Sequence, residues 1–314
     1  MKRIQYHQYG GPEVMRLEDF RPARPGRGEV LVQVRAAAAN PLDWKVRNGE
    51  MRLITGRTFP RGLGYDFAGV VAAVGERVSR LRVGDEVLGG AAMKASGAFA
   101  EMVVAAEKGL VKKPAGLSFE QAAAIPMVGV TALQALMENG KMQPGAAVFV
   151  HGCLGGVGRT AVQLAAVRGA SVVAGSCRTS SMGDARALGV DPVVEFDSVP
   201  SSLNKRFDIV FDTVGSLPPA TARMLLNRGG RVIDIVPSPM KFLRSMVPRS
   251  HYRVQFTQPS LSDLEEIADA CAQGALRIPV AQTVPLAEAI SALIRLECHH
   301  TPKGGKLIIT MNGQ

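Results

Sequence analysis

Cysteine is scarce in this sequence, with four residues among 314: Cys153, Cys177, Cys271 and Cys298. They are widely spaced, so they form neither a disulfide framework nor the close four-cysteine cluster of a structural zinc site. No cysteine precedes position 153, which also removes the ligand pattern of a catalytic zinc site from the first part of the chain. We therefore expect no bound metal and a reducing compartment, the cytoplasm.

The sequence also lacks a long apolar run and an excess of acidic residues. No segment is long and apolar enough to span a membrane, and Met1 leads directly into a strand pattern, so we expect no membrane segment and no signal peptide. Lysine and arginine outnumber acidic residues by 37 to 27, which gives a formal charge of +10. The basic residues are scattered and have no interleaved aromatics, so nucleic-acid binding is only an alternative.

A glycine-rich turn lies between a strand pattern and a helix pattern. The apolar run 148–150 is followed by glycines at 152, 155, 156 and 158, and then by apolar residues at helical spacing. Glycines allow a tight turn, and the free N–H groups of the new helix attract an anion. The pattern predicts a dinucleotide pyrophosphate site at Gly155, Gly156 and Val157.

The next predicted strand, 171–176, indicates which dinucleotide binds. Ser176 ends this strand, and Cys177, Arg178 and Thr179 follow it. None of them is the acidic residue that would accept hydrogen bonds from an unphosphorylated ribose. Ser176 can donate to a 2′-phosphate and Arg178 can pair with it. We therefore expect NADPH as the cofactor, with a solvated loop arginine as the alternative for Arg178.

Strand and helix patterns alternate after this point. Strands are predicted at 192–196, 207–212 and 230–236, and helices at 181–188 and 219–226. This alternation predicts a doubly wound parallel sheet, the Rossmann architecture. Ligands of such sheets lie beyond the carboxyl ends of the strands. The residues expected around that crevice are Gly155, Ser176, Phe196, Thr213, Val236 and Pro237.

The first 117 residues have a different pattern of strands and turns. Short strands are predicted at 29–36, 69–74, 86–89 and 99–105, with glycine and proline between them. Such closely spaced short strands favour a small irregular β-barrel. The length of the chain and this change of pattern predict a second domain.

Several short motifs occur along nearly the whole chain. They lie at 28–32 (Gly-Glu-Val-Leu-Val), 40–43 (Asn-Pro-Leu-Asp), 64–71 (Gly-Tyr-Asp-Phe-Ala-Gly-Val-Val), 83–87 (Val-Gly-Asp-Glu-Val), 97–101 (Gly-Ala-Phe-Ala-Glu) and 152–158. Their order and spacing resemble those of medium-chain dehydrogenases/reductases of the zinc-free quinone oxidoreductase branch. The resemblance implies an α/β protein with a GroES-like β-barrel catalytic domain over 1–117, completed by 258–314, and an NADPH-binding Rossmann domain over 118–257. Tyr65 stands where zinc-dependent relatives carry a ligand histidine.

The segment 40–49 resembles the family loop beside the nicotinamide. The resemblance implies catalytic roles for Asn40, as a donor to a developing oxyanion, and for Lys45, which supplies a positive charge or a proton. It also implies cofactor contacts for Pro41 and Asp43. The alternatives are that Asn40 is a turn residue and that Asp43 caps the following helix.

Two further cofactor contacts are implied by the same resemblance. Thr131 matches a threonine at the start of a helix near the nicotinamide phosphate, and its alternative is a bond to its own helix backbone. The turn that contains Gly304 and Lys306 matches one that closes over the cofactor, and its alternative is a solvated hairpin turn.

These features together predict a metal-independent, NADPH-dependent reduction of a quinone or other α,β-unsaturated carbonyl. Without a metal, charge that develops on an oxygen needs only hydrogen-bond donors. An NADPH-sensing binding protein with little turnover is an alternative. We also expect a homodimer, because a strand at 253–257 would lie at an open edge of the sheet.

Overall fold

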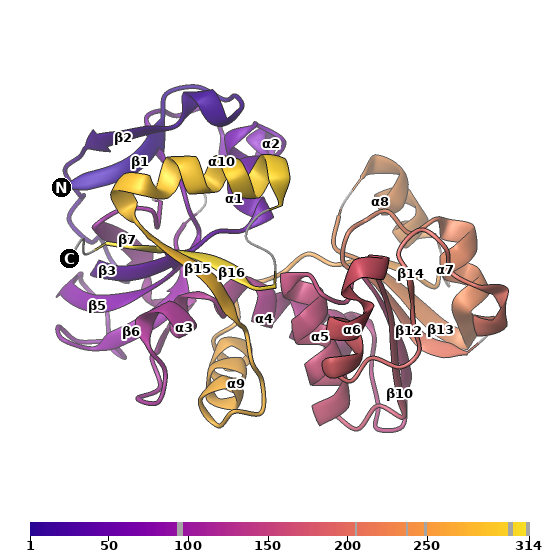
Figure 1. Cartoon of the computed structure of the whole chain (residues 1–314). Helices are drawn as coiled ribbons and strands as arrows, with labels where there is room; N and C mark the ends of the chain where they lie inside the picture. Colours follow the sequence, from indigo (N-terminus) through magenta and orange to yellow (C-terminus); the bar gives the residue numbers. More distant parts are fainter. Residues whose placement is uncertain (93–96, 205, 237, 248–249, 301–303, 312–314) are drawn as a thin grey trace. The chain divides into compact units, whose positions relative to one another are not determined.

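The computed structural model describes residues 1–92, 97–204, 206–236, 238–247, 250–300 and 304–311 (Figure 1). Its contacts divide the chain into two compact units. The first unit is Met1–Met127 with Pro259–Gly274 and Ile278–Gln314, and the second unit is Val128–Gln258 with Ala275–Arg277. None of the described helices has the length and apolar character that a membrane span requires.

The first unit is built mainly from two sheets. The smaller sheet has the strand order β2 (Arg16–Asp19), β1 (Lys2–Tyr6), β4 (Arg61–Gly62). The larger has the order β15 (Val280–Pro285), β16 (Lys306–Thr310), β3 (Glu29–Ala38), β5 (Asp66–Val74), β6 (Glu86–Gly90), β8 (Leu110–Lys112), with β7 (Met102–Ala106) also paired to β3. The C-terminal strand β16 runs antiparallel to the early strand β3, so the chain returns to its first unit (Figure 1).

Close backbone approach shapes the larger sheet. A Cβ atom on Gly69 in β5 would lie 2.2 Å from the carbonyl oxygen of Gln33 in β3, so only glycine fits there. The sequence pattern predicts a barrel, but the ladders among the described strands run from β15 to β8 without closing into a ring. The core between these strands is apolar, with Val32, Phe67 and Phe99 fully buried.

Helices complete the first unit. They are α1 (Pro41–Arg47), α2 (Arg52–Thr55), α3 (Phe119–Ala123), α9 (Leu261–Ala272) and α10 (Ala289–His299), and α4 (Pro126–Gln134) leads into the second unit. α3 packs on β3 and β5, and α10 packs on β15 and β16.

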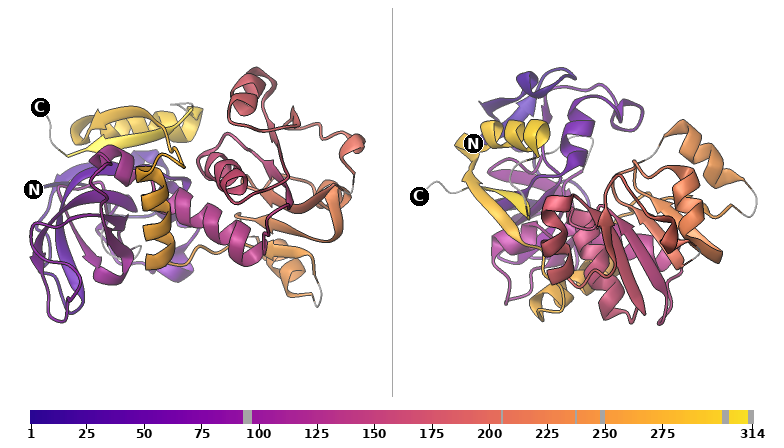
Figure 2. Two further views of the ribbon diagram at one scale, coloured as in Figure 1. Left: turned by 90° about the horizontal axis from the view of Figure 1, so that it is seen from below. Right: turned by 45° about the vertical axis from the view of Figure 1, so that its right-hand side comes forward.

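The second unit contains a six-stranded sheet in which every ladder is parallel. Its order is β11 (Val193–Glu195), β10 (Val172–Cys177), β9 (Ala147–His151), β12 (Phe207–Asp212), β13 (Leu226–Asp234), β14 (Tyr252–Val254). The helices are α5 (Gly156–Val167), α6 (Met182–Ala187), α7 (Pro219–Leu225) and α8 (Pro239–Met246). α5 and α6 pack on β9 to β11 and α7 packs on β12 and β13, which confirms the predicted parallel α/β sheet (Figure 2).

The edge strand of this sheet is shorter than predicted. The sequence pattern predicts a strand at 253–257, whereas β14 covers Tyr252–Val254. The N–H of the next residue, Gln255, still donates to the carbonyl oxygen of Asp234 at 2.8 Å. β14 pairs only with β13, so it does form one edge among the described strands. Phe256 lies beyond the strand and is exposed.

Candidate functional site

The glycine turn after β9 has a geometry that side chains would block. Gly152 has a φ of +77°, in the left-handed region that favours glycine. A Cβ atom on Gly158 would lie 2.2 Å from the carbonyl oxygen of Gly152. The first turn of α5 can therefore pack against the end of the strand only if residue 158 has no side chain. Gly155 is the N-cap residue, and the first turn of α5 carries no acidic side chain. The helix N-terminus therefore presents N–H groups and its positive dipole end to an anion.

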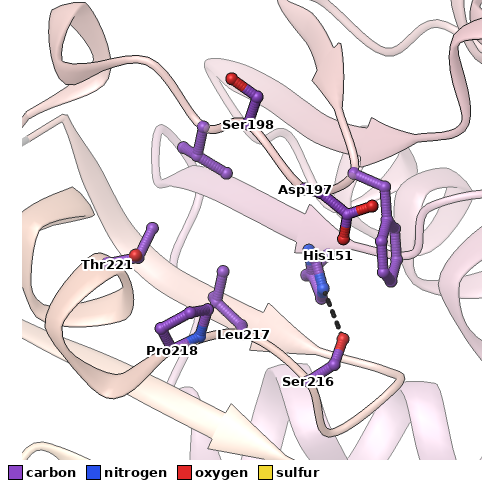
Figure 3. Close-up of a pocket in the computed structure, with 9 residues that line it drawn as sticks. His151, Asp197, Ser198, Ser216, Leu217, Pro218 and Thr221 are labelled. Carbon is purple, nitrogen blue, oxygen red and sulfur yellow. Dashed lines mark hydrogen bonds between the residues drawn. The ribbon is translucent and has the colours of Figure 1, made fainter.

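A pocket of about 410 Å³ lies beyond the carboxyl ends of β9, β11 and β12. This volume falls in the usual range of small-molecule sites. Its lining residues are His151, Phe196, Asp197, Ser198, Val199, Ser216, Leu217, Pro218 and Thr221 (Figure 3). Ligands of parallel sheets bind at this end of the strands, so the pocket lies where the sequence pattern predicts a nucleotide site.

His151, at the end of β9, organises the wall of this pocket. Its Nδ1 atom lies 2.7 Å from Oγ of Ser176. Its Nε2 atom lies 3.1 Å from Oγ of Ser216 (Figure 3). The imidazole stacks on the ring of Phe196, with 4.2 Å between centroids and 27° between planes. Burial lowers the pKa of His151, although the Asp212 carboxylate opposes the shift, so the ring is neutral at physiological pH. Sequence reasoning missed His151 and Ser216; the available signal was a polar residue at the end of an apolar strand.

Ser176, at the end region of β10, is held by internal contacts. Its side chain is fully buried, and its hydroxyl is engaged by His151 and by the backbone N–H of Gly152 at 3.4 Å. The expected contact of Ser176 with a 2′-phosphate stays a prediction. Arg178 and Thr179, in contrast, are exposed just after β10. The Thr179 hydroxyl donates to Oε1 of Glu195 at 2.6 Å. Glu195 ends the neighbouring strand β11, so a carboxylate lies close to Thr179.

Three other residues, Thr213, Val236 and Pro237, are expected to contact the cofactor at this end of the sheet. Thr213 follows β12, and its hydroxyl donates to the carbonyl oxygens of His151 (2.7 Å) and Gly152 (3.2 Å), so it lies at the glycine turn. Val236 lies against Gly215, whose added Cβ atom would be 2.4 Å from that of Val236. Pro237 lies outside the described residues.

Thr131 does not lie where the resemblance implies. It falls in the second turn of α4 (Pro126–Gln134), not at the helix start, and is buried. Its hydroxyl lies 2.7 Å from that of Thr257. The expected role of Thr131 near the nicotinamide phosphate stays a prediction.

In the first unit, Asn40 is buried in a network of hydrogen bonds. Its Nδ2 atom donates to Oδ2 of Asp66 at 2.9 Å and to the carbonyl oxygen of Ala38 at 3.2 Å. Its Oδ1 atom accepts from Nζ of Lys306 at 2.5 Å. An amide has only two N–H hydrogens, and both are engaged here. In this arrangement Asn40 has no free N–H for a substrate oxygen, and its role as an oxyanion donor stays a prediction.

Asp43 and Lys45 lie on α1 with different exposure. Asp43 is buried and accepts the backbone N–H of Asn40 at 2.7 Å, which satisfies one free donor at the start of α1. Burial raises the pKa of Asp43 to about 7. Its expected contact with a cofactor stays a prediction. Lys45 is partly exposed, and its ammonium has no partner in the part of the chain that the structure describes. Pro41 is the exposed first residue of the helix.

The turn before β16 contains Gly304 and leads to Lys306, and its expected contact with the cofactor stays a prediction. Gly304 has a φ of +81°, which allows the turn. Lys306, however, points into the unit, where its ammonium donates to the carbonyl oxygen of Ala39 at 2.8 Å as well as to Asn40. Lys306 is therefore a buried internal cation.

Metal ligands are not assembled within the described ranges. No group of three or more histidine, cysteine, aspartate or glutamate side chains there is placed to hold a metal ion. Metal independence remains a prediction.

Comparisons with known proteins agree with this architecture. Residues 26–115 match the alcohol dehydrogenase GroES-like domain, and residues 188–309 match a family described as zinc-binding dehydrogenase. The quinone oxidoreductase of Pseudomonas aeruginosa is 33% identical over 321 residues, which cover 96% of this chain and 97% of that protein. The chain belongs to the medium-chain dehydrogenase/reductase superfamily, among its quinone oxidoreductase-like members.

This superfamily member has further named relatives. An NADPH-dependent alkenal/one oxidoreductase of Arabidopsis thaliana is 36% identical over 244 residues, which cover 75% of this chain and 62% of that protein. The solved structure of the quinone oxidoreductase from Coxiella burnetii superposes with a TM-score of 0.87 at 30% identity, over 99% of each chain. The resemblance stated from the motifs is thereby confirmed.

Proposed function

We propose that this protein reduces a quinone or another α,β-unsaturated carbonyl with hydride from NADPH, without a metal. The observation that carries the proposal is the glycine turn beside a nucleotide-sized pocket at the carboxyl ends of a parallel sheet. Relatives named quinone oxidoreductase and alkenal/one oxidoreductase support the substrate class. The expected division of labour is a catalytic domain over 1–117, completed by 258–314, and a nucleotide-binding domain over 118–257.

The residues of the second unit fit a dinucleotide. The cradle formed by Gly152 and Gly158 admits no Cβ atom at Gly158, and it leaves the backbone of Gly155, Gly156 and Val157 at a helix N-terminus for the pyrophosphate. The pocket is lined by the stacked rings of His151 and Phe196 together with polar side chains such as Asp197, and this mixture suits a base and a ribose. When bound, the nicotinamide supplies the hydride.

The 2′-phosphate preference rests on Arg178 and Thr179. Arg178 is exposed and charged, and an arginine pairs with phosphate in a fork geometry. No carboxylate ends β10, since its last residue is Cys177. Glu195 on the adjacent strand end weakens the attraction for phosphate, but its Oε1 atom is already paired with Thr179.

On the substrate side, Lys45 is our candidate donor. Hydride addition to a conjugated carbonyl places negative charge on its oxygen, and one charged donor stabilises that charge. The ammonium of Lys45 has no hydrogen-bond partner among the described residues. Asn40, in contrast, donates both of its amide hydrogens to other groups of the protein. Lys45→Met should lower kcat by about a hundredfold, the usual effect of losing one preorganised donor, with NADPH binding unchanged.

The decisive experiment measures NADPH oxidation against a panel of quinones and enones. Turnover that is lost in Lys45→Met and kept in Lys108→Met, an exposed lysine of the same unit, supports the proposal. NADPH binding without turnover of any substrate would instead indicate an NADPH sensor. Salt-dependent binding of RNA or DNA without NADPH binding would indicate the nucleic-acid alternative.

Cofactor preference has a separate test. Arg178→Ala should weaken NADPH binding by about 1.5–3 kcal/mol, the value of a hydrogen bond to a charged group, and leave NADH binding nearly unchanged. Arg228→Ala is the matched control, because Arg228 is also exposed but lies in the first half of β13, away from the carboxyl ends. An equal loss for both cofactors would contradict the NADPH assignment.

A further inference from the structure

A cluster of buried polar side chains joins distant parts of the first unit. Lys306 begins β16, Asp66 begins β5, Asn40 precedes α1 and Asp43 lies within α1. Their relative exposures are 7% for Lys306, 0% for Asp66, 1% for Asn40 and 4% for Asp43. Charged side chains are rarely buried to this degree unless they are paired.

Hydrogen bonds run through the cluster in a defined order. Lys306 donates to Oδ1 of Asn40, which fixes the orientation of the amide, and Nδ2 of Asn40 then donates to Asp66. Asp66 also accepts the backbone N–H of Met127, at 3.1 Å from each carboxylate oxygen, at the start of α4. Asp43 accepts the N–H of Asn40 and holds the start of α1. One ammonium therefore helps to fix the entries of two helices.

The charges of this cluster do not cancel. With every group ionised, one ammonium faces the carboxylates of Asp43 and Asp66. Burial raises the pKa of Asp43 to about 7 and that of Asp66 to about 6, and the Lys306 ammonium opposes both shifts. Burial lowers the pKa of Lys306, and the two carboxylates oppose that shift. Among the described residues, Tyr65 also faces the cluster, and burial and Asp66 raise the pKa of its phenol to about 12.

A small cavity lies against one member of the cluster. Its volume is about 20 Å³, enough for one water molecule. Its lining residues are Leu42, Asp43, Val46, Gly62, Leu63, Gly64 and Tyr65.

We infer that Lys306 is a positioning residue: its buried ammonium orients the Asn40 amide and balances Asp43 and Asp66, and thereby fixes α1, the helix that carries Lys45. The link to Lys45 rests on the proposed function. Without the ammonium, the carboxylates would remain buried without a counter-charge. The helix entries would then be held correctly only when the carboxyl groups are protonated.

The test compares Lys306→Met with Lys108→Met across pH. Removal of the cation raises the pKa values of both carboxyl groups further above their unfolded values, so the folded state binds protons that the unfolded state releases. The unfolding temperature of Lys306→Met should therefore fall further below that of the parent as the pH rises from about 5 to about 8. Lys108→Met should track the parent throughout.

A double variant separates charge from lost packing. Lys306→Met/Asp43→Asn restores the original charge balance, so it should recover part of the deficit at high pH. A deficit of Lys306→Met that is the same at every pH, or that the double variant does not reduce, would overturn the inference. If Lys306→Met does not fold at neutral pH, purification near pH 5 followed by a shift to higher pH gives the same comparison.

Kinetics supply the link to α1. Because misplacement by about 1 Å costs on the order of a hundredfold in rate, kcat of Lys306→Met should fall by about that factor at pH 8 and recover as the pH is lowered, while KM for NADPH changes little. A kcat that stays at the parent value across this range would contradict the positioning role. If the parent protein reduces no quinone or enone, the proposed function fails, and the unfolding measurements alone decide whether Lys306 balances the cluster.

Discussion

Replacement of Asp43 by asparagine should change the pH dependence of stability in a calculable way. Burial raises the pKa of Asp43 in the folded protein to about 7, whereas an aspartate in an unfolded chain has a pKa of about 3.9. Between these values the folded state holds a proton that the unfolded state has lost. The parent protein therefore loses stability from this group as the pH rises from about 4 to about 7.

The magnitude follows from that difference. About 3 pKa units at 1.36 kcal/mol each give about 4 kcal/mol, all of it lost above pH 7. Asp43→Asn cannot ionise, so it avoids this loss. It also gives up part of the hydrogen bonding to the N–H of Asn40, which costs about 1 kcal/mol at every pH. Asp43→Asn should be about as stable as the parent near pH 4.5 and more stable by about 3 kcal/mol near pH 8.

Urea denaturation at several pH values is the assay. Trp44, the only tryptophan of the chain, follows Asp43 on α1, so its fluorescence reports on the unit in question. Asp184→Asn is the matched control, because Asp184 is exposed on α6. A difference between Asp43→Asn and the parent that stays constant within about 0.5 kcal/mol across this range would refute the reasoning.

Three other outcomes are expected. Glu297→Gln should cost about 3 kcal/mol in urea denaturation, because it breaks a pair at 2.8 and 2.9 Å with the buried guanidinium of Arg47; an unchanged midpoint would contradict this. Dialysis against a strong chelator should leave activity intact, whereas a rate that zinc restores would show a metal requirement. Light scattering should give about twice the 33.3 kDa chain mass, because β14 leaves an open sheet edge, and a monomer mass at micromolar concentration would exclude the dimer.

The parallel sheet was predictable from local sequence. The apolar run before the glycines, the helical spacing after them and the next apolar strands each depend on residues close together in the chain. Gly152 and Gly158 were also identifiable, because the turn excludes side chains for steric reasons that involve only a few neighbouring residues. The exact ends of β14 were not, since edge pairing depends on the neighbouring strand.

The roles of individual polar side chains were decided by tertiary structure. Ser176 was expected to face a phosphate, but a partner 25 positions earlier, His151, takes its hydroxyl. Asn40 was expected to face a substrate, but Lys306, 266 positions later, fixes its amide. Sequence alone determined where the chain turns and which faces are apolar, because those follow from backbone sterics and the period of the pattern. Which polar groups are buried, paired or free for a ligand depends on contacts between distant segments, and only the folded chain brings those together.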